Sequence, residues 1–282
     1  MTITPAKPFL RWVGGKRSLL PVLLPLIPDR GLWDNYREPF VSGGAMFYAL
    51  QPQVALLSDS NEELIHLYKV IRSKTQCRDF LNYLEHHQEK HSFDHYMQSR
   101  KDLNQIITGQ WKANPIYRAT LFYYLNKICF NGLWRVNSKG EFNVPMDRSK
   151  KKLEVNKQNI LACSRLLRES AALEACSFKD FFGKNGHIIG RREFWFLDPP
   201  YDGKHNDYVV EGFTGQDQEK LLLLCYKIHR ASSYFMLTSS DTPFIRKLYQ
   251  KDFKIIKANV QHSVAAAGNK RTIDKEIIIM NY

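Results

Sequence analysis

The 282 residues, 44% of them hydrophobic, suffice for one large α/β domain with a smaller one attached, and 41 Lys and Arg against 28 Asp and Glu give a formal charge of +13. Because self-repulsion at this charge opposes compaction, we expect a polyanionic partner, most commonly nucleic acid; a merely basic surface is the alternative. Five scattered cysteines argue against a zinc or disulfide framework, and no apolar run is long enough for a membrane span or signal peptide, so we expect a soluble cytoplasmic protein without a metal.

The first predicted elements form a βαβ pattern. Strand-like runs at 36–41 and 54–57 are separated by a glycine-containing turn and a short apolar segment, and a helix from about 61 to 71 follows. Ser60 or Asn61 can cap that helix, since both side chains offer an oxygen to its free N–H groups.

Strand patterns then disappear from about 74 to 165, where helical stretches precede a Gly- and Asn-punctuated segment near 131–145. Strands are predicted again later in the chain, with a helix at about 216–230 between two of them. These strands lie at 173–178, 193–197, 234–238, 253–260 and 276–280. Alternating strands and helices predict a largely parallel sheet covered on both faces, built from both ends of the chain around a mostly helical insertion.

The glycine-containing turn follows the first strand at Phe40–Gly44, where small residues such as Gly43 let the backbone approach a ligand closely. An ordinary tight turn is the alternative. Asp59 ends the next strand, the usual place of an acid that binds ribose hydroxyls. Its alternative function is helix capping.

The segment 127–157 is strongly basic, with eight Lys and Arg against three acids. Arginine can bind guanine edges in the major groove, and lysine neutralises phosphates. Asn131-Gly132 and Lys139-Gly140 supply sharp turns that can present Arg135 and its neighbours to a groove. For the Lys150–Lys152 run, a solvated face is the alternative reading.

The most specific motif is Asp198-Pro199-Pro200-Tyr201, directly after the apolar run 194–197. Ligand chemistry in open α/β sheets lies beyond the carboxyl ends of strands, although a plain strand-ending turn is the alternative. Asp198 and the Pro199 carbonyl offer acceptors for the two N–H bonds of a base amino group, and Tyr201 can stack on the base. These groups are what methylation of an amino group would require, on a base that has first been extruded from the duplex.

Four segments in this order resemble the motifs of Dam-like, site-specific DNA adenine-N6 methyltransferases: 9–16, 38–45, 129–145 and 198–201. The resemblance implies a Rossmann-like methyltransferase sheet, S-adenosylmethionine as methyl donor with S-adenosylhomocysteine as product, and double-stranded DNA as partner. It assigns 1–73 and 165–282 to a catalytic domain, and 74–164 to a helical target-recognition domain with a DNA-reading hairpin at about 130–147.

Roles for single residues follow from the same resemblance. Catalysis is implied for Asp198, Pro199, Pro200 and Tyr201. Contact with the cofactor is implied for Trp12, Lys16, Phe40, Gly43, Asp59, Phe178 and Asp198. Contact with DNA is implied for Arg11, Phe130, Asn131, Leu133, Arg135, Asn137, Pro145 and Arg148, with Phe130 filling the space that the flipped base leaves. One departure is Ser42, where the family usually has glycine; a need for positive φ there would lower cofactor affinity.

Several alternatives stay open. The target is GATC, which we favour slightly, or a longer site that begins with GAT. A catalytically silent DNA-binding regulator could retain the fold, and an enzyme that methylates RNA or a protein glutamine would have a similar turn, usually with Asn first. Residues 202–207 could cover the base and 269–271 could contact phosphate. We expect a monomer or a weak dimer.

Overall fold

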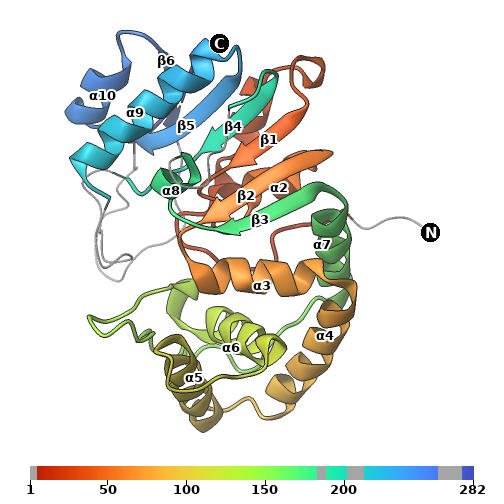
Figure 1. Ribbon diagram of the computed structural model, residues 1–282. Helices are drawn as coiled ribbons and strands as arrows, with labels where there is room; N and C mark the ends of the chain where they lie inside the picture. The colour runs from red at the N-terminus through yellow and green to blue at the C-terminus, as the bar shows by residue number, and fades with distance from the viewer. Residues whose placement is uncertain (1–4, 183–188, 202–212, 260–274) are drawn as a thin grey trace.

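The computed structural model describes residues 5–182, 189–201, 213–259 and 275–282. A mixed seven-stranded sheet occupies one half of the molecule, and a group of helices lies beside it in the other half (Figure 1). The strands are β1 Asn35–Glu38, β2 Val54–Asp59, β3 Ala171–Ala175, β4 Glu193–Leu197, β5 Tyr234–Ser240, β6 Lys254–Asn259 and β7 Lys275–Met280. Their order across the sheet is β3-β2-β1-β4-β5-β7-β6.

Five neighbouring strands, β3 to β5 in this order, run parallel, whereas β7 runs antiparallel to both β5 and β6. Parallel neighbours need crossover connections, and these carry the helices that cover the two faces. The largely parallel, Rossmann-like α/β sheet predicted from the sequence is therefore confirmed. It brings the carboxyl ends of β1, β2 and β4 to one edge.

Helices with short 3₁₀ turns connect the strands. In the first third of the chain they are η1 Lys16–Ser18, α1 Leu20–Leu23, η2 Leu24–Leu26, η3 Arg30–Leu32, α2 Ala45–Leu50 and α3 Glu62–Arg72. Between α3 and β3 lie α4 Lys74–Glu89, α5 Phe93–Ile107, α6 Pro115–Ile128, η4 Phe130–Gly132 and α7 Lys157–Ser170. Later come α8 Phe178–Phe182, α9 Gly215–Arg230 and α10 Pro243–Tyr249. Helix α6 packs against α3, α4 and α5, so the helical half is built around it.

Two predicted strands extend three residues past their ends in the structure. Strand β1 ends at Glu38 rather than at residue 41, because Pro39 has no N–H to continue the ladder. The strand predicted at 173–178 is wrong at its end: β3 stops at Ala175, and Phe178 begins α8. Ser177 starts this helix, since its hydroxyl accepts from the Asp180 N–H at 3.2 Å.

Strand β4 is buried along its whole length because both faces of the sheet are covered. Alternate side chains enter opposite cores: Phe194 and Phe196 belong to one apolar cluster, and Trp195 and Leu197 to the other. The first cluster continues into α6, where Tyr123 stacks near Phe9 at 6.5 Å. One core thus joins the sheet to the helices.

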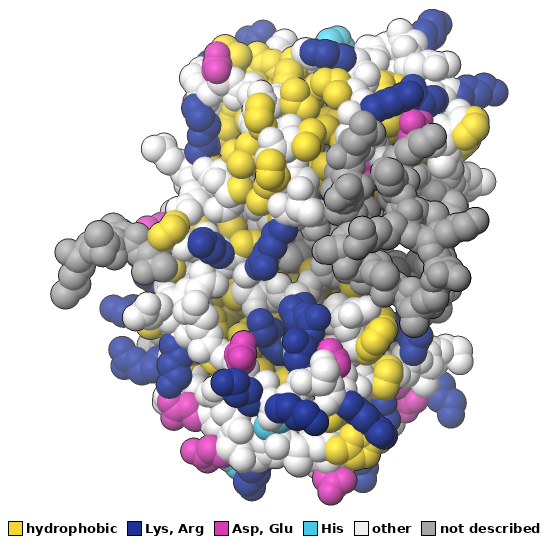
Figure 2. Space-filling model, turned by 180° about the vertical axis from the view of Figure 1, so that it is seen from behind, with side chains coloured by type: hydrophobic (Ala, Val, Ile, Leu, Met, Phe, Trp, Pro, Cys, Tyr) yellow, Lys and Arg dark blue, Asp and Glu magenta, His cyan; other side chains and the backbone are white. Residues whose placement is uncertain are grey.

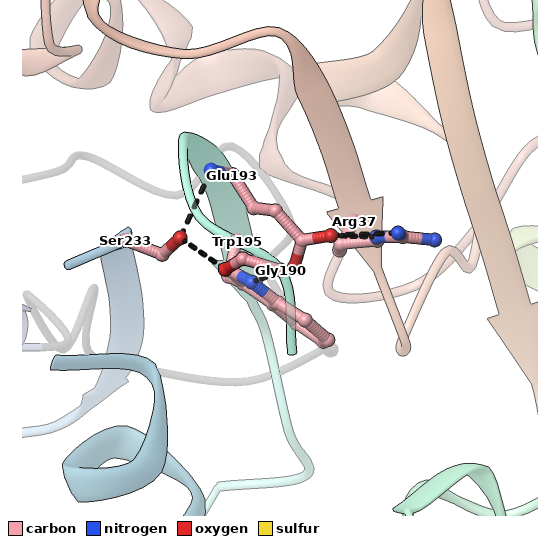
Figure 3. A network of polar contacts seen from close by, with 5 residues as sticks. All are labelled: Arg37, Gly190, Glu193, Trp195 and Ser233. Atoms are coloured by element: carbon pink, nitrogen blue, oxygen red, sulfur yellow. Dashed lines mark hydrogen bonds and ion pairs between the residues drawn. The ribbon is translucent and has the colours of Figure 1, made fainter. Parts of the chain in front are cut away.

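A polar network fixes the start of β4 (Figure 3). The carboxylate of Glu193 pairs with Arg37 of β1 at 2.6 Å and accepts from the Trp195 indole N–H at 3.0 Å. Its backbone N–H donates to the Ser233 hydroxyl at 2.9 Å, which in turn donates to the Gly190 carbonyl at 2.9 Å. Because Glu193 is 1% exposed, these bonds satisfy a buried charge and hold the strand that leads to Asp198.

Within the part of the chain that the structure describes, no helix has both the length and the apolar character needed to cross a bilayer.

Candidate active site and nucleic-acid interface

Asp198 stands directly after β4, at the carboxyl edge of the sheet. Its Oδ1 atom receives the Lys16 ammonium at 2.8 Å and the Thr238 hydroxyl at 2.7 Å. Lys16 also donates to the Gly14 carbonyl at 2.8 Å, and its side chain is 7% exposed. Burial raises the pKa of Asp198, and the contacts with Lys16 and Thr238 oppose that rise. A paired carboxylate is therefore held in a largely water-free position.

Tyr201 completes the turn, half-buried, with its hydroxyl donating to Glu276 Oε2 of β7 at 2.9 Å. The Lys16 ammonium lies over the ring, 4.7 Å from its centroid. Between Asp198 and Tyr201, Pro199 is buried and Pro200 is exposed. Three sequence-predicted residues, Lys16, Asp198 and Tyr201, thus meet in one cluster.

The loop after β1 bends back toward the N-terminal segment. Ser42 has a φ of +49° and Gly44 a φ of +68°, so the bend needs two left-handed residues. A Cβ on Gly43 would lie 3.2 Å from the Cβ of Trp12, which leaves little room for any side chain there. The departure noted in the sequence therefore falls on a backbone conformation that glycine adopts more easily than serine.

Asp59 ends β2 beside this loop. Its two carboxylate oxygens accept separate backbone bonds, from the Ser42 N–H at 2.9 Å and from the Asn61 N–H at 3.0 Å. Burial raises the pKa of Asp59, and these N–H groups oppose the rise. Helix α3 is capped by Asn61, whose Oδ1 accepts from the Leu64 N–H at 3.0 Å, so the capping alternative for Asp59 is wrong.

An aromatic wall stands near the same edge. Phe178 lies 5.5 Å from Phe40 and 5.3 Å from Phe213, measured between ring centroids. Sequence reasoning missed Phe213, which precedes α9 and carries no motif. The structure therefore places a carboxylate, a close-approach loop and an apolar wall at one sheet edge, which are the features a nucleoside needs.

The segment 129–146 folds back on itself. Antiparallel bridges join Cys129 to Met146 and Val136 to Phe142, and the turns use the positive φ of Asn131 (+55°), Gly132 (+66°) and Gly140 (+78°). Asn137 holds the tip, since its Oδ1 accepts from the N–H groups of Lys139 and Glu141 at 2.9 and 3.0 Å. The predicted turn residues therefore shape this hairpin-like segment.

Its predicted DNA-contacting side chains differ in exposure. Phe130 is 49% exposed, and Arg135 is exposed with its Nε donating to Asn143 at 2.8 Å. Pro145 and Arg148 are also exposed, whereas Leu133 is partly buried against the core. The surface of the hairpin thus offers both an exposed apolar ring, Phe130, and an exposed planar cation, Arg135.

Basic residues from three segments gather next to the hairpin. Burial lowers the pKa of Lys127, and the nearby charges of Arg11, Arg17 and Lys150 lower it further. Figure 2 shows Lys and Arg side chains concentrated across the middle and lower part of one face, whereas hydrophobic side chains gather over its upper part. Mutual repulsion of closely spaced cations is costly unless an anion compensates it, so this patch suits a phosphate backbone.

Residues 202–207 and 269–271 lie outside the described residues. Besides Phe213, sequence reasoning missed Asn126, Thr238 and Glu276. The one available signal was a buried polar residue inside an apolar run, as for Asn126 in 121–128 and Thr238 in 234–240.

The sequence is similar to those of DNA-methylating enzymes over nearly its whole length. Residues 12–264 match the family model described as D12 class N6 adenine-specific DNA methyltransferase. The type II methyltransferase M1.LlaDCHI of Lactococcus lactis subsp. cremoris is 33% identical, covering 98% of this chain and 95% of its own. M.MjaIII of Methanocaldococcus jannaschii is 33% identical, covering 98% and 99%. The DNA adenine methylase of Escherichia coli K12 is 26% identical, covering 96% and 94%.

Proposed function

Because this chain belongs to the D12 class N6 adenine-specific DNA methyltransferases and is therefore an adenine-methylating enzyme that acts on DNA, we propose that S-adenosylmethionine is its methyl donor and duplex DNA its substrate. We further propose GATC as the target, with a longer site beginning with GAT as the alternative. The observation that best supports methyl transfer to a base amino group is the Asp198 carboxylate, which is largely buried at a strand end and held by Lys16 and Thr238.

The residues present fit the donor. Backbone N–H groups of Ser42, Ser60 and Asn61 bond to the Asp59 carboxylate, which has about four lone-pair sites, so acceptor capacity remains for a ribose hydroxyl. Phe40 and Phe178 form an apolar surface for an adenine ring, and Gly43 lets that ligand approach the backbone beside Trp12. When bound, S-adenosylmethionine supplies an electrophilic methyl carbon on sulfur.

The chain's own residues prepare the nucleophile. The N6 lone pair of adenine is delocalised into the ring, so the nitrogen is a poor nucleophile. Asp198 and the Pro199 carbonyl accept its two N–H bonds and direct the lone pair at the methyl carbon. With the donor bound, the amino nitrogen would take the methyl group while the sulfur keeps the electron pair of the C–S bond, and the Asp198 carboxylate, which accepts one N–H bond, would receive the proton that the nitrogen loses. This is catalysis mainly by positioning.

Tyr201 stabilises the extruded base. Since Lys16 covers one face of its ring, the base stacks on the other face, a contact worth about 1–3 kcal/mol. Extrusion itself costs a few kcal/mol of unstacking, so stacking and hydrogen bonding must offset it. Phe130, exposed beside the hairpin, fills the space left in the duplex.

Recognition is assigned to the helical half. We propose that 74–164 form the target-recognition domain and that 1–73 and 165–282 form the catalytic domain. Arg135 reads a guanine edge, with Asn131, Leu133, Asn137 and Pro145 shaping or lining the same surface. Arg11 and Arg148 bind phosphates, together with the basic patch around Lys127.

One experiment tests activity and target together. A plasmid co-expressed with this chain should carry N6-methyladenine at GATC, or within a longer site beginning with GAT, when its adenine methylation is sequenced. The variant Asp198→Ala should leave the plasmid unmethylated while binding duplex DNA as tightly as the wild type, because it removes an acceptor and no phosphate contact.

A silent regulator is the second candidate, and the positive φ of Ser42 in the cofactor loop favours it. Equilibrium binding of S-adenosylmethionine separates the two functions. Intact DNA binding with neither S-adenosylmethionine binding nor plasmid methylation would establish the regulator and refute the enzyme mechanism.

A further inference from the structure

We propose that Thr238 and Glu276, on the two strands after β4 in the sheet, are positioning residues for methyl transfer: Thr238 aims the Asp198 carboxylate at the base, and Glu276 orients the Tyr201 ring. The proposal rests on the roles assigned above to Asp198 and Tyr201. Neither residue belongs to any of the four motifs on which the sequence resemblance depends.

Register explains how Thr238 reaches the site. Leu237 of β5 pairs with Leu197 of the parallel strand β4. Thr238 comes directly after Leu237, and Asp198 comes directly after Leu197, so the two residues are neighbours across the two strands. The two side chains stand next to each other at the same edge, with 2.7 Å between Thr238 Oγ1 and Asp198 Oδ1. Thr238 is 0% exposed, so its hydroxyl has no water to compete for this bond.

The bonds from Lys16 and Thr238 make the two carboxylate oxygens of Asp198 different from each other. Both donors, the Lys16 ammonium and the Thr238 hydroxyl, bind Oδ1. From the described residues, no hydrogen bond reaches Oδ2. With Oδ1 fixed on two sides, the carboxylate cannot rotate freely, and Oδ2 remains as the acceptor for an amino N–H. Because the Thr238 proton is donated to Oδ1, it does not compete with that amino group.

Glu276 acts on the other functional side chain of the turn. Strand β7 pairs with β5 so that Glu276 lies opposite Ser240, beyond Thr238 on the same edge. Its carboxylate is 4% exposed and accepts the Tyr201 hydroxyl at 2.9 Å. A ring held at its hydroxyl by Glu276, and covered on one face by Lys16, presents a single fixed face for stacking.

Charge explains why a neutral hydroxyl is placed there. Burial and the nearby carboxylate of Glu276 raise the pKa of Asp198, whereas Lys16 and Thr238 lower it. Among the described residues, the titratable groups that face Asp198 are Lys16 from η1, Tyr36 and Glu38 from β1, Tyr201 from its own turn and Glu276 from β7. Thr238 is thus a donor that favours the ionised, accepting form of Asp198 without adding a charge.

The test compares Thr238→Val with Thr238→Ser. Valine keeps the shape and loses the donor, whereas serine keeps the donor. The rate of single-turnover methylation of a GATC duplex, with labelled S-adenosylmethionine, is measured across pH. The dissociation constants of S-adenosylmethionine and of the duplex are measured for the same variants. We expect Thr238→Val to slow the methyl-transfer step about 10- to 100-fold, since a bond to a charged acceptor is lost, while both dissociation constants stay within about twofold.

The pH profile separates positioning from structure. In Thr238→Val the acid limb of the rate should move to higher pH, because the bond that lowers the pKa of Asp198 is gone. Thr238→Ser should keep the wild-type rate and the wild-type position of the acid limb. The matched control is Thr120→Val on α6. It removes another fully buried hydroxyl, which donates to the Tyr117 carbonyl at 2.8 Å. This variant should change neither the rate nor the acid limb.

Glu276 is tested in the same assay. Glu276→Gln keeps an acceptor for Tyr201 and should stay within about threefold of the wild-type rate, whereas Glu276→Leu should lose about tenfold or more. If Thr238→Val does not fold, Thr238→Cys, a much weaker donor, is measured instead, with the same slowed rate and shifted limb expected.

Failure of the inference is distinct from failure of the proposed function. A wild-type enzyme that methylates, together with Thr238→Val showing the rate and pH profile of Thr120→Val, overturns the role of Thr238. A Glu276→Leu variant at the wild-type rate overturns the role of Glu276. A wild-type protein that transfers no methyl group to any duplex overturns the proposed function itself.

Discussion

The side chain of Asn126 forms hydrogen bonds with both backbone polar groups of Arg11: its Oδ1 accepts from the N–H at 3.1 Å, and its Nδ2 donates to the carbonyl at 2.7 Å. The same Nδ2 lies 3.3 Å from the carbonyl of Gly132. Asn126 is 3% exposed in α6. One buried amide therefore joins the segment that leads to Trp12 with the turn that begins the hairpin.

Replacing this amide should destabilise the protein strongly. Asn126→Leu removes three hydrogen bonds and leaves the buried polar groups of Arg11 and Gly132 without a partner, so we expect the free energy of unfolding to fall by about 2–4 kcal/mol. Urea denaturation measures it. The control is Asn82→Leu at an exposed position of α4, which should change stability by less than about 0.5 kcal/mol. Equal losses of unfolding free energy in Asn126→Leu and Asn82→Leu would show that the hydrogen bonds of Asn126 add no particular stability.

Ser42 and Ser232 share a strained backbone, with φ of +49° and +57°. Glycine tolerates this region, so Ser42→Gly and Ser232→Gly should each stabilise the fold by about 0.5–1 kcal/mol. Only Ser42 lies in the proposed cofactor loop, beside Asp59. We therefore expect Ser42→Gly alone to tighten S-adenosylmethionine binding, measured by calorimetry; identical affinities in both variants would place Ser42 away from the cofactor.

Arg135 and Lys151 are both exposed cations of the basic segment 127–157, but we assign them different tasks. Arg135→Ala should relax preference at one base pair by about 1–3 kcal/mol, because a base-edge contact is lost. Lys151→Ala should weaken all duplexes alike and reduce the slope of log K against log salt by about 0.9, because one phosphate contact is lost. Competition binding with single-base variants at several salt concentrations measures both. Unchanged base preference in Arg135→Ala would contradict its assignment.

The elements were largely predictable because their signals are local. The apolar run before Asp198 gave β4 with its correct ends, Glu193 and Leu197, and the acids after Asn61 marked the start of α3. The end of β3 was missed because Cys176 and Phe178 continue the apolar character of the strand, while the hydroxyl of Ser177 starts a helix. That decision depends on a hydrogen bond, which hydrophobic periodicity does not report.

The site was predictable only where a motif marked it. Lys16 and Asp198 stood in recognisable segments and Asp59 stood at the end of a predicted strand, but the pairing of Tyr201 with Glu276 joins residues 75 positions apart. The contact of Thr238 with Asp198 depends on which strand lies beside β4 and in which register. Strand order is a property of the whole fold, so no local pattern in β5 or β7 tells which residue of the site their side chains will meet.

His87 is a buried neutral histidine in the helical half. Its Nδ1 lies 2.9 Å from His95 Nε2, and its ring stacks on Tyr124 at 4.8 Å between centroids. Burial, with smaller contributions from His95 and His86, lowers the pKa of His87 to about 3. In the unfolded chain the same imidazole titrates near 6.5. Below that pH the unfolded state therefore binds one proton more than the folded state.

Stability should accordingly be complete above pH 6.5 and decline as the pH falls toward 3, by up to about 1.4 kcal/mol per pH unit from this group. His87→Phe keeps a stacking ring and removes the titration, so its unfolding free energy should fall less steeply than that of the wild type between pH 6.5 and 5. The exposed control His229→Gln should keep the wild-type slope. Urea denaturation at four pH values measures the slopes. Parallel curves for His87→Phe and the wild type would mean that His87 is protonated in the folded protein, at odds with its burial against Tyr124.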